Sequence, residues 1–110
     1  MDNPALLAKL LPHCGTVIHL ASATTPGNSA NHPVLELENL APSLRLLETL
    51  QAYPETHLIF FSSGGTLYGN PQSLPVREND PVTPLSYHGA GKAALEAFLH
   101  AFRARGQAVT

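Results

Sequence analysis

Apolar residues recur at helical spacing in three segments of the chain. The clearest segment is 86–105, where one face carries Ala94, Leu95, Phe98, Leu99 and Phe102. Leucines at every third or fourth position predict a second helix over 34–52, in which Pro42 either kinks the helix or marks its real start. A shorter apolar run predicts a helix over 3–11 that ends near Pro12.

Two short apolar runs, 16–21 and 57–61, have the composition of strands that are buried on both faces of a sheet. The segments 22–33 and 70–84 are rich in Pro, Gly and polar residues, so we expect loops there. Residues 107–110 are a candidate third strand. Helices alternating with strands predict an α/β fold with a parallel sheet of about three strands, right-handed crossovers and flanking helices.

Composition and charge argue for a globular protein and against nucleic-acid-binding and membrane proteins. The chain has 110 residues, 44% of them apolar and 13% charged, which suits one small globular domain. A net charge of −2 without a basic stripe argues against nucleic-acid or anionic-membrane binding. Apolar runs are far shorter than the roughly 20 residues of a membrane span, and no signal peptide is recognisable, so we expect a cytoplasmic protein.

Cysteine and histidine usage gives no sign of a disulfide framework or a metal centre. Cys14 is the one cysteine of the sequence, so an internal disulfide is ruled out. His13, Cys14 and His19 are close in sequence, but the alternation of a strand does not gather them as zinc ligands. We therefore predict no metal site.

Small residues follow both predicted strands. Ala21 and Ser22 come after the first strand, and Ser62 and Ser63 begin a run of small residues after the second. In parallel α/β sheets, ligands bind beyond the carboxyl ends of the strands, where small side chains let a flat cofactor ring or sugar approach the backbone. These positions either line a binding cleft or only allow tight turns.

Lys92 lies one turn inside the last predicted helix. A partner on the same helix face stands four residues earlier, at His88. Tyr87 stands five residues earlier, and at ~100° per residue it points about 140° away from Lys92 in a continuous helix. Tyr87 approaches Lys92 only if the helix begins as late as Gly89.

The order and spacing of four motifs resemble the NAD-dependent epimerase/dehydratase family of extended short-chain dehydrogenases/reductases, across nearly the whole chain. The segments Val17–Ala21, Asn39–Glu48, Ser62–Gly69 and Pro84–Lys92 are similar to the fourth strand, the next helix, the fifth-strand turn and the Tyr-x-x-x-Lys helix of that family. The resemblance implies a partial Rossmann fold with three layers. Residues 1–110 would form one partial NAD(P)-binding domain, closest to UDP-glucose 4-epimerase-like members.

The resemblance also implies a chemistry and a set of site residues. A base paired with Lys92 takes a proton from a hydroxyl of a nucleotide sugar while hydride passes transiently to NAD. NADP is the alternative cofactor. Tyr87 or His88 is the candidate base, Ser63 the candidate hydroxyl donor, and Asn39 the supporting residue. Ala21, Ser22, Ser62 and Lys92 are the candidate cofactor contacts. Helices 34–52 and 86–105 resemble those that form the family's dimer.

Three features of the sequence depart from the family pattern. His88, rather than a tyrosine, stands four residues before Lys92, and Gly64 stands where the family's catalytic hydroxyl is expected. The sequence also contains no Gly-x-x-Gly-x-x-Gly loop to hold the dinucleotide pyrophosphate. The alternative function is therefore a noncatalytic piece or association module that binds no cofactor, for which an unpaired strand edge at 16–21 would be suited.

Overall fold

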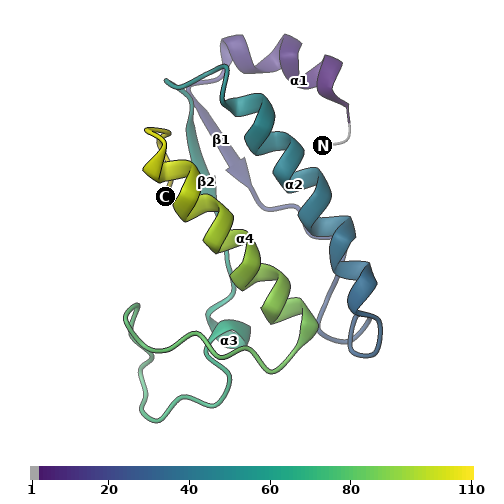
Figure 1. Cartoon of the computed structure of the whole chain (residues 1–110), viewed down its shortest axis with the longest axis vertical. Coiled ribbons are helices and arrows are strands. Elements are labelled where there is room, and N and C mark those ends of the chain that lie inside the picture. Colours follow the sequence, from purple (N-terminus) through teal and green to yellow (C-terminus); the bar gives the residue numbers. More distant parts are fainter. Residues whose placement is uncertain (1–2) are drawn as a thin grey trace.

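The computed structural model describes residues 3–110 and has the alternating helices and strands expected from the sequence (Figure 1). In chain order the elements are α1 (Pro4–Leu10), the 3₁₀ turn Leu11–His13, β1 (Thr16–His19), the 3₁₀ turn Pro33–Glu36, α2 (Leu37–Leu50), β2 (His57–Phe60), α3 (Gly64–Leu67) and α4 (Tyr87–Ala104). The three predicted helices and the first two predicted strands are present, and α3 is an additional turn of helix. The α/β prediction and the partial Rossmann-like fold are confirmed.

The sheet consists of two parallel strands, with Thr16 of β1 opposite His57 of β2. The predicted third strand is reduced to a single bridge between Leu58 and Val109. Leu58 N–H donates to the Ala108 carbonyl and Thr110 N–H donates to the Leu58 carbonyl, both at 2.9 Å. Residues 108–110 therefore lie along one edge of β2 while β1 occupies the other.

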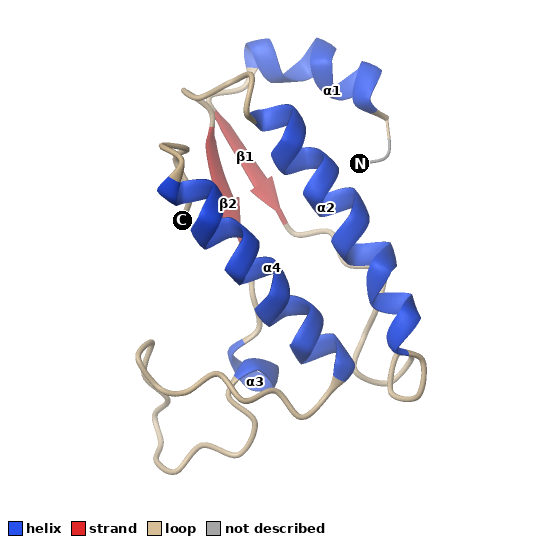
Figure 2. Ribbon diagram, viewed as in Figure 1, coloured by secondary structure: helices blue, strands red, loops and turns tan. Residues whose placement is uncertain are grey.

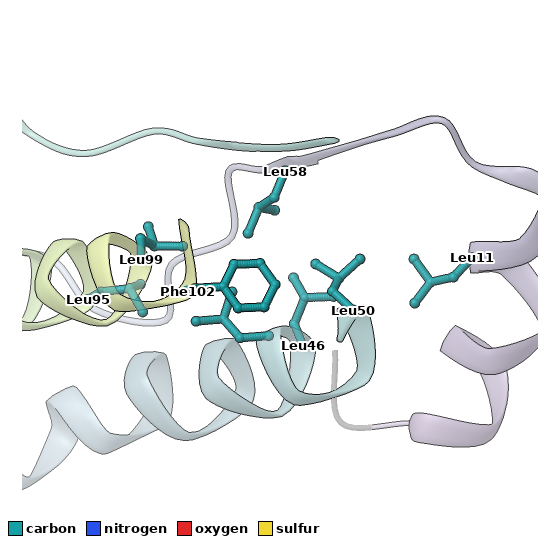
Figure 3. Close-up of a cluster of buried hydrophobic side chains, with 8 residues drawn as sticks. Leu11, Leu46, Leu50, Leu58, Leu95, Leu99 and Phe102 are labelled. Atoms are coloured by element: carbon teal, nitrogen blue, oxygen red, sulfur yellow. The ribbon is translucent and has the colours of Figure 1, made fainter. Parts of the chain in front are cut away.

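Helices α2 and α4 lie side by side against one face of the sheet (Figure 2). Their facing leucines and Phe102 meet Leu58 of β2 in one apolar cluster, to which Leu11 adds from the 3₁₀ turn after α1 (Figure 3). On the other sheet face Ile18 is 57% exposed, and Leu20 and Phe61 beyond the strand ends are similarly open. Of the three layers expected, residues 3–110 thus supply the sheet and one helical layer.

The starts of the two long helices settle two points that the sequence left open. Helix α2 begins at Leu37, after a 3₁₀ turn, so Pro42 lies inside the helix and does not mark its start. Helix α4 begins at Tyr87 because the Ser86 hydroxyl accepts the Gly89 N–H at 3.0 Å, as an N-cap does. The suggestion that this helix begins only at Gly89 is therefore wrong.

No helix within residues 3–110 combines the length and the apolar character needed to cross a bilayer.

Candidate active site

Lys92 lies on the second turn of α4 and reaches the carboxyl end of β2. Its Nζ donates to the Phe61 carbonyl at 3.3 Å and lies 4.9 Å from the centre of the Phe60 ring. Burial lowers the pKa of the Lys92 ammonium, and the nearby Glu36 carboxylate opposes that shift only in part. The structure therefore places this cation where ligands of parallel α/β sheets bind.

The Thr24 hydroxyl and three side chains around it form a hydrogen-bonded group, which we call the Thr24 cluster: Thr24, Glu36, Asn39 and His88. Thr24 Oγ1 lies 3.1 Å from Glu36 Oε2 and 3.1 Å from Nδ1 of His88. The Asn39 amide nitrogen donates to both Thr24 Oγ1 and Glu36 Oε2. Thr24, Glu36 and His88 are all more than 90% buried, so the cluster joins the loop after β1 to the first turns of α2 and α4.

The Glu36 carboxylate is ionised although it is buried. Burial alone raises its pKa, but the neighbouring Ser29 hydroxyl, the hydrogen bonds from Asn39 and Thr24, and nearby His88 lower the pKa below the ordinary value. The Ser29 hydroxyl itself donates to a backbone carbonyl, so Asn39 and Thr24 are the direct partners of Oε2. The other oxygen, Oε1, is buried without a hydrogen bond.

Helix α4 approaches this carboxylate closely because it has a glycine at position 91. A Cβ atom on Gly91 would lie 2.7 Å from Glu36 Oε2, which is closer than such atoms pack. At Gly89, two residues nearer the helix start and so on a different face of the helix, an added Cβ would lie 2.4 Å from the Thr66 carbonyl oxygen. The two glycines therefore let α4 pack against both the Thr24 cluster and α3.

Tyr87 is separated from these groups. It is 46% exposed and lines an open groove with residues that include Pro26, Ala30 and Leu85. The structure gives it no hydrogen bond to Lys92 or to the Thr24 cluster. Of the two candidate bases, His88 is the one that the structure brings together with Asn39.

The candidate residues after the strands are distributed over two places. Ser22 donates to the Thr24 carbonyl at 3.0 Å, and the Asn39 side-chain oxygen accepts the Ala23 N–H at 2.6 Å, so the loop after β1 is fixed beside the Thr24 cluster. Ala21 is exposed at the start of that loop. Ser62 lies apart from the Thr24 cluster, in an open pocket that it lines with residues of α4.

Ser63 precedes α3, and its backbone carbonyl accepts the N–H groups of Thr66 and Leu67 at 3.1 Å. Its side chain makes no hydrogen bond to another candidate residue among those described.

His19 forms a second buried polar contact next to the site. Its Nε2 lies 2.8 Å from the Ser43 hydroxyl, which in turn donates to the Asn39 carbonyl at 2.6 Å. Because the hydroxyl proton is used on that carbonyl, Nε2 of His19 must carry the ring proton. Burial and the nearby Lys92 ammonium lower the pKa of His19, so the ring is neutral at pH 7.

Comparison with known proteins identifies the family. The model of the NAD dependent epimerase/dehydratase family matches residues 1–110. The chain belongs to this family. It is 38% identical over 84 residues to a putative UDP-glucose 4-epimerase of Methanocaldococcus jannaschii, which covers 76% of the chain and 28% of that protein. It is 33% identical over 103 residues to the UDP-glucose 4-epimerase of Mycolicibacterium smegmatis, covering 93% of the chain and 32% of the relative.

Solved structures of the epimerase/dehydratase family have the same arrangement of elements. The UDP-glucose 4-epimerase of Thermus thermophilus, in complex with NAD, matches 96% of the chain with a TM-score of 0.85 and 31% identity. The Brucella ovis UDP-glucose 4-epimerase, also in complex with NAD, matches 97% with a TM-score of 0.87 and 27% identity. The chain covers 34% of each of these structures, so it spans about a third of the length of such relatives.

Two members of the Thr24 cluster were missed by the sequence analysis of this epimerase/dehydratase chain. Thr24 lies in a loop rich in Ser and Thr, where nothing singles out one hydroxyl. Glu36 carried a usable signal, because it stands three residues before Asn39 and therefore on the same side of the helix. Among residues 3–110, no group of three or more His, Cys, Asp or Glu side chains is placed to hold a metal ion.

Proposed function

We propose that this chain supplies the catalytic edge of an NAD-dependent nucleotide-sugar epimerase or dehydratase, in which a sugar carbon is transiently oxidised. The observation that carries this proposal is the position of Lys92 at the carboxyl end of β2, with His88 four residues earlier on the same helix. Family membership and relatives that are UDP-glucose 4-epimerases support it. In this proposal residues 1–110 form one partial NAD(P)-binding domain.

The residues present fit one end of the dinucleotide. Lys92 uses its ammonium on a single carbonyl, so it has further protons to offer to the nicotinamide ribose. Ala21, Ser22 and Ser62 follow the two strands and leave room for a ring near the backbone. When bound, NAD supplies the hydride acceptor. Residues 1–110 contain no glycine-rich loop for the pyrophosphate, so in this proposal they contact only the ribose end of the dinucleotide.

The remaining roles in the proposal belong to the other candidate residues that the sequence indicated. His88 takes the proton from the reacting sugar hydroxyl, with Tyr87 as the alternative base, since the unprotonated nitrogen of an imidazole can act as a general base. Ser63 donates a hydrogen bond to the reacting oxygen. Asn39 supports His88 through the Thr24 hydroxyl, to which it donates.

Helices α2 and α4 are also the proposed homodimer surface. They lie side by side, and each carries an exposed large apolar side chain: Leu37 on α2 is 57% exposed and Phe98 on α4 is 48% exposed. Two copies that pair these helices would form a four-helix bundle and bury both side chains.

A noncatalytic association module is the second candidate function. The observation that favours it is the open side of β1: Ile18 and Leu20 are more than half exposed, and the strand edge away from β2 is unpaired among the described residues. Parallel sheets are ordinarily covered on both faces, so this surface is suited to another chain or segment.

Cofactor binding by the 110-residue chain distinguishes the two candidates. Calorimetry with NAD⁺, NADH and NADP⁺ would compare the wild type with Lys92→Ala and with Lys9→Ala, an exposed lysine on α1 that serves as the control. Loss of a charged hydrogen bond weakens binding about tenfold or more, so Lys92→Ala should show that loss and Lys9→Ala should not. A chain that is folded by circular dichroism yet binds no dinucleotide would favour the association module. Binding that is equal in all three proteins would exclude the assigned role of Lys92.

A further inference from the structure

The Thr24 hydroxyl has one proton to donate, and its surroundings decide which neighbour receives it. Glu36 Oε2 and Nδ1 of His88 each lie 3.1 Å from Thr24 Oγ1. An ionised carboxylate has no hydrogen and can only accept, whereas a neutral imidazole nitrogen can either donate or accept. Because hydrogen bonds to a charged acceptor are the stronger ones, the Thr24 proton goes to Glu36.

The orientation of the Asn39 amide is fixed independently. Its oxygen accepts the Ala23 N–H at 2.6 Å, and a backbone N–H is always a donor. The amide nitrogen must therefore face Thr24 and Glu36, and it donates to both. One lone pair of Thr24 Oγ1 is thus occupied by Asn39, and its proton is occupied by Glu36. The remaining lone pair can only accept a proton from His88.

We propose that Glu36 is a positioning residue that acts through the Thr24 hydroxyl to hold His88 in the Nδ1–H tautomer, with the Nε2 lone pair available as the proton acceptor. Nε2 of His88 makes no hydrogen bond to any residue in 3–110. The catalytic meaning of this tautomer rests on the proposed function. In that reaction the sugar O–H bond breaks, an Nε2–H bond forms, and the resulting imidazolium keeps its Nδ1–H bond to Thr24.

The same physical logic gives the neighbouring histidine the opposite tautomer. Ser43 donates to the Asn39 carbonyl and so must accept from Nε2–H of His19. His19 therefore serves as an internal reference for His88. A difference between these two rings is not expected from burial, which is nearly equal at 6% and 8% exposure, but follows from the direction of their hydrogen bonds.

Long-range proton–nitrogen NMR correlation on the ¹⁵N-labelled full chain, at a pH where both rings are neutral, tests the inference directly. The signals of His88 are assigned by their loss in His88→Gln. We expect Nδ1 of His88 and Nε2 of His19 to carry the proton in the wild type. An Nε2–H tautomer at His88 in the wild type would overturn the inference, and this measurement depends on no other variant.

Thr24→Val removes the hydroxyl while keeping the shape of the side chain. We expect it to lower the Nδ1–H to Nε2–H ratio at His88 by about tenfold, the effect of one hydrogen bond, with His19 unchanged. Thr49→Val, at a threonine whose hydroxyl donates within α2, should leave both rings unchanged. An unchanged ratio in a folded Thr24→Val chain would show that Thr24 does not select the tautomer. Failure of NAD⁺ binding with the tautomer as expected would reject the proposed function and leave the positioning role of Glu36 intact.

Discussion

Replacing Gly91 by alanine is expected to destabilise the chain, against the ordinary preference of helices for alanine. An alanine in place of a mid-helix glycine normally contributes about 1 kcal/mol of stability. Here the new Cβ would lie 2.7 Å from Glu36 Oε2, an atom that is held by Thr24 and Asn39. Moving the carboxylate weakens two hydrogen bonds to a charged group, each of which contributes about 1.5–3 kcal/mol. We therefore expect a net loss of about 2 kcal/mol or more after the helix preference is subtracted.

Urea unfolding followed by far-ultraviolet circular dichroism measures this effect, and a double-mutant cycle isolates its cause. In a Glu36→Ala background the clash is absent, so Gly91→Ala should instead stabilise the chain by up to about 1 kcal/mol. Gly65→Ala is the control, because an added Cβ at that position in α3 meets no atom within 4 Å. A stabilising Gly91→Ala in the wild-type background, equal to that in the Glu36→Ala background, would refute the assigned packing of α4 on the carboxylate.

Three further predictions concern the core, a turn and a titrating ring. Leu50 is 1% exposed, so Leu50→Ala should lower the free energy of unfolding by about 2–5 kcal/mol. Leu85 is 73% exposed, so Leu85→Ala should lower it by less than about 0.5 kcal/mol, and urea unfolding compares the two variants. Gly69→Ala should cost more than about 2 kcal/mol in the same assay, since φ is +57° and a Cβ would lie 2.3 Å from a carbonyl oxygen. The pKa of His19 is lowered by burial and by Lys92, so below about pH 6.5 the unfolded chain binds a proton that the folded chain does not. The contribution of this ring should lower the free energy of unfolding by at most about 1.4 kcal/mol for each unit of decreasing pH. His19→Gln should reduce that slope, and an unchanged slope would contradict the lowered pKa of His19.

The proposed chemistry depends on which side chain occupies the helix position four residues before Lys92 and how it is directed, and the start of α4 decides its direction. With Ser86 as the N-cap, Tyr87 becomes the first residue of the helix and is directed to an open groove. His88 then occupies the buried position four residues before Lys92. Serine is preferred at helix N-caps, and this preference is a local signal. Ser86 therefore allowed the start of α4 to be predicted from the sequence.

The helices and strands were predicted from the sequence because their signals are local. The apolar spacing over 86–105 and 34–52 corresponds to α4 and α2, apart from a few residues at each end. The 3₁₀ turn before α2 was missed, since a 3₁₀ turn differs from an α-helix in hydrogen bonding rather than in composition. The predicted strand at 107–110 is longer than the single bridge that the structure has there, because the length of a strand depends on the partner that it pairs with.

The sequence by itself determined the α/β pattern, the family resemblance and the spacing of Lys92 from His88, since each depends on residues close along the chain. The tertiary structure alone decided the Thr24 cluster. Thr24 and His88 are 64 residues apart, and Thr24 and Glu36 are 12 apart. Their contact depends on how α4 packs over the loop after β1, which Gly91 permits by leaving space for the carboxylate. Hydrogen-bond direction within the cluster follows from that packing, because a hydroxyl has one proton and its neighbours determine where it goes.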